Sequence, residues 1–138
     1  MPTTIDAADR FEIADLFARL ADVLDESRFD DIGTVYAPDV SVSSPRGGEL
    51  RGLDEVKAFL HRTAVADERT HHIHSGVRIT EDGAGVRVSA SQLVIYYQEG
   101  EAPHRRSGLR LAYTAVRTPD GWRLTQGQLA LAWTEPAR

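Results

Sequence analysis

The sequence contains no cysteine in its 138 residues. Disulfide bonds, thiolate nucleophiles and all metal sites that need a cysteine ligand are therefore excluded. A chain of this length without disulfides must fold around a hydrophobic core, and a content of 41% apolar residues is sufficient for one. We expect a single domain spanning residues 1–138, and the lack of cysteine is compatible with a reducing compartment.

Long hydrophobic runs and an excess of positive charge are also missing. No apolar run is long enough to span a bilayer, and residues 1–6 lack the basic and apolar segments of a signal peptide. The formal charge is −5, and the arginines are scattered among acids instead of forming a stripe. We therefore expect a cytoplasmic protein that binds neither membranes nor nucleic acid.

The first half of the chain has helical periodicity. Between residues 6 and 26, apolar side chains recur every three or four positions: Ile13, Leu16, Phe17, Leu20 and Leu24. Thr4 or Asp6 can cap the start of this helix, and Asp25 lies at its end beside a row of alanines. Shorter helices are expected at 29–36 and 53–66, with short strands at 40–43 and 49–51 between them.

The second half has the pattern of long β-strands. Strands are expected at 70–80, 84–98, 105–117 and 122–133, joined by short connections that include the tight turn Pro119-Asp120-Gly121. Short connections make the strands antiparallel neighbours, and strands of this length must curve. Helices followed by strands predict an α+β fold, in which a curved antiparallel sheet forms a cone around the first helix.

Three histidines lie close together at the start of the first long strand. Strict alternation along residues 69–79 puts His71 on a face with Ile73, Val77 and Ile79, and puts the other two histidines on a polar face. If the apolar face lines an interior, His71 is the imidazole placed in a dry site. An imidazole with an ordinary pKa of about 6.5 can accept a proton at neutral pH.

Five segments, in order along the chain, resemble the nuclear transport factor 2-like superfamily, and within it the SnoaL-like and scytalone dehydratase-like branch. They are Leu24-Asp25 with Phe29-Asp30, Tyr36-Ala37-Pro38-Asp39-Val40, Gly52-Leu53-Asp54-Glu55-Val56, Thr70-His71-His72-Ile73 and Asp120-Gly121-Trp122-Arg123-Leu124. The resemblance implies a curved, cystatin-like α+β barrel with an open conical pocket, assembled as a homodimer or homotrimer. It also implies that an aspartate at the end of the first helix contacts a histidine on the first long strand, here Asp25 and His71.

Other positions depart from the dehydratase pattern. Leu24 and Ser44 stand where two tyrosines are expected, Tyr96 where a second histidine is expected, and Ala112 where an asparagine is expected. These departures imply a different substrate. The expected chemistry is proton removal next to a carbonyl by His71, oriented by Asp25, followed by elimination, isomerisation or cyclisation without a cofactor.

Several other side chains are candidates for contact with a small, largely apolar substrate. Tyr36, Gln92 and Tyr96 can polarise a substrate oxygen, and Tyr96 is favoured over Tyr97 because it shares a face with Val94 and Gln92. The remaining candidates are Phe17, Ser44, Ile73 and Trp133, although for Trp133 a packing role is favoured over contact with a ligand.

Three alternatives stay open at this point. The pocket can belong to a ligand-binding or oligomerisation module without catalysis. A metal site on His72 and His74 would need further ligands that the spacing does not supply, so no metal is expected. An epoxide hydrolase would need an arginine between two acids in the pocket, and Arg78 is expected on the face opposite His71.

Overall fold

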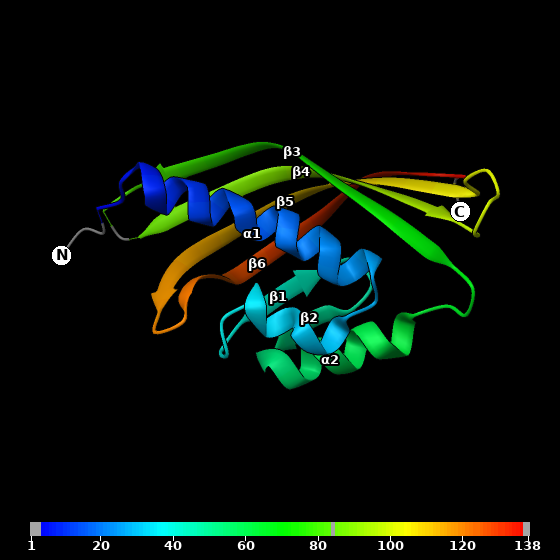
Figure 1. The fold of residues 1–138 in the computed structure, drawn as a ribbon, viewed down its shortest axis with the longest axis horizontal. Coiled ribbons are helices and arrows are strands. Elements are labelled where there is room, and N and C mark those ends of the chain that lie inside the picture. The colour runs from blue at the N-terminus through cyan, green and yellow to red at the C-terminus, as the bar shows by residue number, and fades with distance from the viewer. Residues whose placement is uncertain (1–3, 84, 137–138) are drawn as a thin grey trace.

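The structure is a computed structural model and describes residues 4–83 and 85–136. Within these residues, two α-helices, one 3-10 helix and six strands follow one another (Figure 1). They are α1 (Ala7–Asp25), η1 (Phe29–Thr34), β1 (Ser41–Ser44), β2 (Gly48–Arg51), α2 (Gly52–Thr63), β3 (Arg69–Glu81), β4 (Val86–Tyr97), β5 (Arg105–Thr118) and β6 (Gly121–Glu135). Among the described residues, no helix is long and apolar enough to cross a membrane.

The six strands form one curved sheet in the order β2-β1-β6-β5-β4-β3. The long strands β3 to β6 pair with one another in antiparallel orientation, as predicted, and β1 joins the sheet through a parallel pairing with β6. The sheet is open, with β2 and β3 at its edges, so the predicted cone is an open cup and not a closed barrel. Figure 1 shows α1 lying across the long strands, with η1 and α2 beside β1 and β2.

The predicted elements agree with the observed ones to within a few residues. The segment predicted as a helix at 29–36 is a 3-10 helix, and the helix predicted at 53–66 ends at Thr63. Residue 84, where the second long strand was expected to begin, lies outside the described residues, and β4 begins at Val86. The N-cap of α1 is Asp6, which forms a reciprocal capping box with Asp9.

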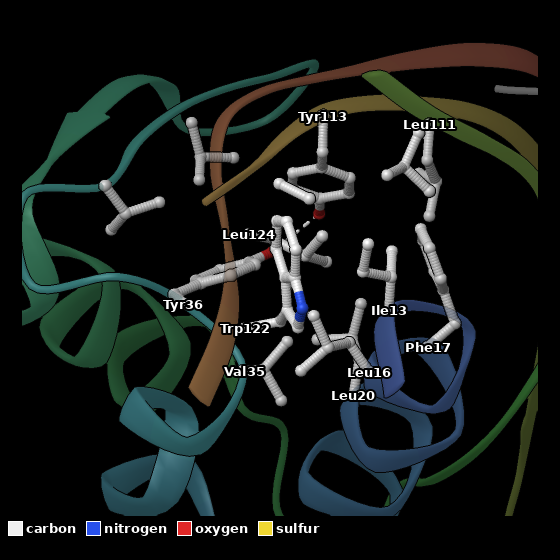
Figure 2. Packing of buried hydrophobic residues seen from close by; sticks show 14 of the residues in the cluster. Ile13, Leu16, Phe17, Leu20, Val35, Tyr36, Leu111, Tyr113, Trp122 and Leu124 are labelled. Atoms are coloured by element: carbon white, nitrogen blue, oxygen red, sulfur yellow. Dashed lines mark hydrogen bonds between the residues drawn. The ribbon is translucent and has the colours of Figure 1, made fainter. Parts of the chain in front are cut away.

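The hydrophobic core lies between α1 and the inner, α1-facing side of the sheet. Residues of the predicted α1 stripe pack against side chains of β5 and β6 and against the chain that follows η1 (Figure 2). The fully buried members include Ile13, Leu16, Phe17, Val35 and Leu124. Burial of about five such side chains contributes on the order of 10 kcal/mol before the entropy cost of folding, so α1 is firmly anchored on the sheet.

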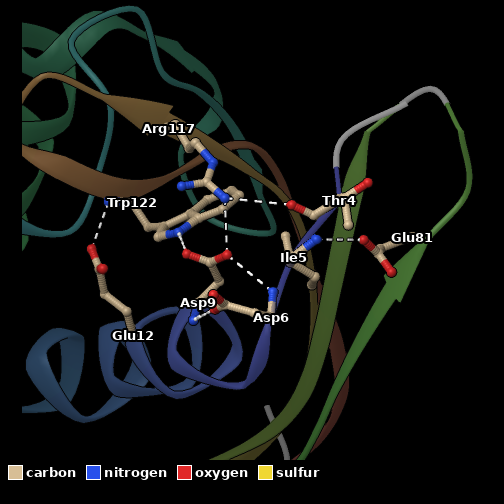
Figure 3. A network of polar contacts seen from close by, with 8 residues as sticks. All are labelled: Thr4, Ile5, Asp6, Asp9, Glu12, Glu81, Arg117 and Trp122. Carbon is tan, nitrogen blue, oxygen red and sulfur yellow. Dashed lines mark hydrogen bonds and ion pairs between the residues drawn. The ribbon is translucent and has the colours of Figure 1, made fainter. Parts of the chain in front are cut away.

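A polar network joins the beginning of α1 to the turn before β6 (Figure 3). The indole N–H of the buried Trp122 donates to Asp9 at 3.1 Å, and its backbone N–H donates to Glu12 at 2.8 Å. Arg117 stacks on the Trp122 ring and pairs with Asp9 at 2.9 Å. Trp122 is therefore a packing residue, and the network fixes the end of α1 that lies far from Asp25.

A β-bulge in β3 decides which side chains face the interior. The pairing of β3 with β4 shifts register between Ser75 and Arg78, and Gly76 adopts a positive φ of 63°. Before the bulge, the half-buried positions are the even-numbered ones; after it, Val77 and Ile79 are half-buried and pack against the core. The bulge thus reverses the alternation, since the extra residue moves the following side chains to the other face.

Candidate active site

A cavity of about 760 Å³ opens between the end of α1, η1, α2 and the inner face of the sheet. Its volume suits a small organic molecule. The sheet contributes lining residues from β1, β3, β4, β5 and β6, among them Thr70, His72, Gln92, Val94, Tyr96 and Ser107. Apolar side chains of α1 and α2, such as Leu24 and Leu60, complete the lining.

Asp25 and His72 form the central polar pair of this cavity. The Oδ1 atom of Asp25 lies 2.6 Å from the Nδ1 atom of His72. Asp25 also accepts hydrogen bonds from the backbone N–H of His72 at 2.9 Å and from the Thr70 hydroxyl at 3.0 Å. These contacts dock the C-terminal end of α1 on β3 and hold the carboxylate in one orientation.

The electrostatic balance keeps Asp25 ionised. Burial on its own raises the pKa of Asp25, but hydrogen bonds from the His72 side chain, the His72 backbone and Thr70 outweigh burial, so the net pKa is lowered. An ionised carboxylate is an acceptor only, so Nδ1 of His72 must carry the proton. Nε2 of a neutral His72 then carries the lone pair, and it has no hydrogen-bond partner within residues 4–83 and 85–136.

The histidine that contacts Asp25 is therefore not the predicted one. His71 is exposed on the outer face of the sheet, opposite Ile95 of β4, whereas the hydrogen bonds of Asp25 go to Thr70 and His72. The prediction of His71 depended on one unbroken alternation from His71 to Ile79, and the bulge at Gly76 interrupts this alternation. Val77 and Ile79 do face the interior, but the bulge before them brings His72 inward instead of His71.

His74, the third histidine of the strand, lies behind the cavity lining. Its Nε2 is hydrogen-bonded to the side-chain oxygen of the buried Gln92 at 2.8 Å, and its ring packs edge-on against Phe17. Burial lowers the pKa of His74, and the nearby His72 acts in the same direction, whereas Gln92 opposes the shift. A neutral His74 thus positions Gln92, whose side chain lines the cavity.

Two buried tyrosines meet at the inner end of the cavity. The hydroxyl groups of Tyr36 and Tyr113 are 2.7 Å apart, and both residues line the cavity (Figure 2). Burial raises the pKa of Tyr36 to about 12, against the opposing effect of the Tyr113 hydrogen bond. Burial also raises the pKa of Tyr113 well above its usual value. Both phenols therefore stay protonated at neutral pH.

The other predicted substrate contacts fall into two groups. Gln92, Tyr36, Tyr96 and Ser44 line the cavity, where their proposed role in substrate binding stays a prediction. Phe17 is buried in the core behind His74 and does not belong to the lining, so its predicted substrate contact is corrected to a packing contact.

Ile73 and Trp133 lie outside the cavity, and their predicted substrate contacts are wrong. Ile73 is 42% exposed on the outer face, because it shares that face with His71. Trp133 is 46% exposed and covers Gly108 on the same outer face. A register shift between β5 and β6 places Leu131 opposite Leu109 and Trp133 opposite Gly108, so Leu131 lines the cavity instead.

Three cavity residues, His72, Thr70 and Tyr113, were not predicted from the sequence. The signal for His72 was present, because a glycine within a strand often marks a bulge, and Gly76 follows the histidines directly. No comparable signal pointed to Tyr113, whose partner Tyr36 lies 77 positions earlier in the chain.

The side chains around the dyad include histidines and carboxylates, which are potential metal ligands. Within the described part of the chain, no group of three or more His, Cys, Asp or Glu side chains could hold a metal ion. His72 and His74 are engaged with Asp25 and Gln92, respectively. A second hollow, of about 540 Å³, is lined by polar side chains that include Arg78 and Arg87 and contains neither histidine.

Comparison with known proteins agrees with the fold. A family model described as the SnoaL-like domain matches residues 6–126, and the chain therefore belongs to the SnoaL-like family of the nuclear transport factor 2-like superfamily. The uncharacterized protein Rv2910c of Mycobacterium tuberculosis is 28% identical over 127 residues, covering 90% of this chain and 86% of that protein.

Two solved structures illustrate the range of similar proteins. The Kfla4162 protein of Kribbella flavida is 26% identical with a TM-score of 0.82, and the alignment covers 95% of this chain and 96% of that one. A hexachlorocyclohexane dehydrochlorinase, LinA type 2, is 15% identical with a TM-score of 0.80, covering 95% of this chain and 90% of that one. At 15% identity, the likeness to LinA shows a shared fold.

Proposed function

We propose that the protein is a cofactor-free enzyme that removes a proton next to the carbonyl of a small, largely apolar compound. His72 is the general base and Asp25 orients it. The observation that carries this proposal is the 2.6 Å contact between Asp25 Oδ1 and His72 Nδ1 at the wall of the cavity. It leaves the Nε2 lone pair of His72 as the basic site.

The reaction begins when Nε2 of His72 takes a proton from a carbon beside the carbonyl. The electron pair of the broken C–H bond moves to the carbonyl oxygen, and the imidazolium is stabilised by the ionised Asp25. The imidazolium can return its proton to a leaving group, to another carbon or to an oxygen. These three outcomes correspond to elimination, isomerisation and cyclisation, so the proposal covers lyase, isomerase and cyclase chemistry.

The negative charge on the substrate oxygen needs a hydrogen-bond donor. Tyr36 and Tyr113 share one hydrogen bond, so one of the two hydroxyl protons is used between them and the other is available for a further acceptor. Burial keeps both phenols protonated, as a donor must be. We infer that this tyrosine pair, together with the Gln92 amide, polarises the substrate carbonyl.

The family and its structural relatives are compatible with this chemistry. The name of the dehydrochlorinase LinA denotes an elimination, namely the loss of HCl from a chlorinated ring. That protein has the fold of this chain, so the fold can hold a site that performs eliminations. Fold alone does not assign the reaction, and the proposal therefore depends on the Asp25–His72 pair.

We also propose that the chain works as a homodimer or homotrimer. Ile73 of β3, Leu93 of β4 and Trp133 of β6 lie in one row across the outer face of the sheet, in which Gly108 of β5 stands between Leu93 and Trp133. Exposed apolar area on a sheet face generally has a partner, and a second copy offers the same row. Light scattering after size exclusion should give more than one chain per particle, and Trp133→Arg should shift that mass towards the monomer.

A solvent-exchange screen tests the proposed reaction without knowledge of the final product. The protein is incubated in D₂O with a panel of small cyclic ketones and hydroxy-ketones, and deuterium incorporation next to the carbonyl is followed by mass spectrometry. Enzyme-dependent exchange, loss of water or ring formation supports the proposal. A compound that stabilises the protein against heat but is recovered without exchange or change identifies a ligand-binding module instead, and contradicts the proposed enzyme.

A further inference from the structure

The charged side chains that line the cavity are mostly paired with partners. Asp25 is paired with His72 and Glu68 with His104, while Arg69 is paired with Glu99. Glu26, at the end of α1, is paired with Arg28. The charged groups of these pairs are directed at their own partners, so they are less available to a ligand, and Asp67 also lines the cavity but belongs to none of these pairs.

Arg105 is different, because it lines the cavity without forming an ion pair with any carboxylate of the described residues. It begins β5 and is half-buried, and its guanidinium lies over the ring of Tyr96, 5.5 Å from the ring centroid. Contact with the ring limits the orientations of the guanidinium while its N–H groups stay available. Arg46 also lines the cavity without an ion pair, but it belongs to an exposed turn between β1 and β2.

The sheet register fixes where Arg105 lies relative to the dyad. Arg105 pairs with Tyr96, and Tyr96 pairs with Thr70, whose hydroxyl binds Asp25. These three residues form one inward row across three strands, and His72 lies in the next inward row. Since neighbouring strands are about 4.8 Å apart, the Cα atoms of Arg105 and Thr70 are about 10 Å apart. The space between the side chains of Arg105 and Thr70 has room for a ligand of one or two rings.

We propose that Arg105 is a specificity-determining residue that binds an anionic group of the substrate, so that the substrate is a small cyclic carbonyl compound carrying a carboxylate. A guanidinium forms two parallel hydrogen bonds with a carboxylate, and the partly enclosed cavity weakens screening of that contact. The carboxylate on Arg105 would place the far side of the ring system near Nε2 of His72. This inference deepens the proposed function and rests on it for the role of His72.

Binding of two matched probes tests the inference without any turnover. The affinities of 2-naphthoate and 2-naphthamide, which have nearly the same shape and differ in charge, are measured by calorimetry at pH 7.5. Wild type should bind 2-naphthoate about tenfold more tightly than 2-naphthamide, as expected for a charge-assisted contact at a partly buried site. Arg105→Met should bring the two affinities to within about twofold, and Arg105→Lys should restore part of the difference.

Control variants separate this inference from its alternatives. Arg110→Met, which alters an exposed arginine of β5 outside the cavity lining, should keep the tenfold preference. His72→Asn should also keep it, because the anion site does not include the imidazole. Equal wild-type affinities, no binding of 2-naphthoate, an unchanged preference in Arg105→Met, or loss of the preference in Arg46→Met alone would each overturn the assignment to Arg105.

The two proposals can fail separately. If wild type prefers 2-naphthoate through Arg105 but exchanges no deuterium into any ketone, only the proposed reaction fails. If ketones exchange deuterium while the two probes bind equally, only the anion site fails.

Discussion

Asp25 accepts a hydrogen bond from the ring of His72 and another from the backbone N–H of the same residue. The double contact ties the end of α1 to β3, so one carboxylate both orients an imidazole and joins two elements of the fold. Asp25 should therefore affect activity and stability together, and the two effects can be separated by choice of variant and pH.

Replacing Asp25 by Asn should reduce turnover at least about tenfold. The Asn side chain can donate to Nδ1 of His72, which favours the tautomer with the proton on Nε2 and removes the lone pair from the reacting position. The measurement is kcat on a substrate found in the exchange screen, combined with ¹⁵N NMR of the His72 ring. Asp22→Asn, at an exposed position of the same helix, is the matched control and should retain wild-type values. A wild-type tautomer and kcat in Asp25→Asn would contradict the orienting role.

The stabilising effect of Asp25 should be lost in acid. Its pKa is lowered in the folded protein from an ordinary value of 3.8, so the unfolded state binds more protons as the pH falls through this range. The difference in unfolding free energy between wild type and Asp25→Asn should be fully present above about pH 5 and should shrink below about pH 4. Urea denaturation at a series of pH values measures this difference, and a constant difference would show that the ionised carboxylate adds no stability.

His74 should make the protein less stable at mildly acidic pH. Burial lowers its pKa in the folded state, so the unfolded chain takes up a proton first as the pH falls below about 6.5. The unfolding free energy of wild type should therefore fall between pH 7.5 and 5.5, and it should fall less in His74→Gln, which has no titrating ring. The same pH dependence in both proteins would place the proton uptake elsewhere.

Replacing Tyr36 by Phe removes one hydroxyl of the buried tyrosine pair. We expect a loss of about 1 kcal/mol in unfolding free energy and at least about a tenfold loss in kcat, because a buried hydrogen bond and a donor to the substrate oxygen disappear together. Absorbance titration should show that the variant lacks a phenol ionising near pH 12. Tyr97→Phe, on the strand face opposite Tyr96, is the control and should leave kcat unchanged; an equal effect of both variants would argue against a specific role for Tyr36.

Local periodicity predicted most elements of this fold correctly, and the bulge at Gly76 explains why it predicted the wrong histidine. The helical stripe of α1, the four long strands and Asp25 at the helix end were all readable from local periodicity, because each depends on neighbours within one element. The inward-facing histidine depends on a single inserted residue in β3, which reverses the faces of the strand. Strict alternation therefore named His71 when the structure turns His72 inward.

The tyrosine pair marks a second limit of sequence reasoning. Tyr36 was a candidate by itself, but its contact with Tyr113 arises from the packing of the chain after η1 against β5 and β6. The wrong prediction that Trp133 contacts the substrate has a similar origin, since the position of Trp133 follows from a register shift between β5 and β6. Contacts of this kind depend on the register of distant strands, about which a periodic pattern carries no information.

The bulge itself can be tested by replacing Gly76 with Ala. A Cβ at Gly76 would meet no neighbouring atom, so the cost comes only from its positive φ of 63° and should be about 1 kcal/mol in unfolding free energy. Gly85→Ala is the control, because its Cβ also meets open space while its φ is not in the positive region. Equal stability of the two variants would contradict the bulge geometry on which the inward position of His72 depends.

The most direct test of the catalytic claim compares His72→Asn with His71→Asn, two substitutions of the same kind at adjacent positions of β3. Both proteins are first checked for wild-type folding by circular dichroism, and deuterium exchange into a responsive ketone is then measured at equal enzyme concentration. We expect His72→Asn to lose at least about a hundredfold in rate, the lower range for a general base, and His71→Asn to stay within about twofold of wild type. Full activity in His72→Asn, or a large loss in His71→Asn alone, would contradict the account.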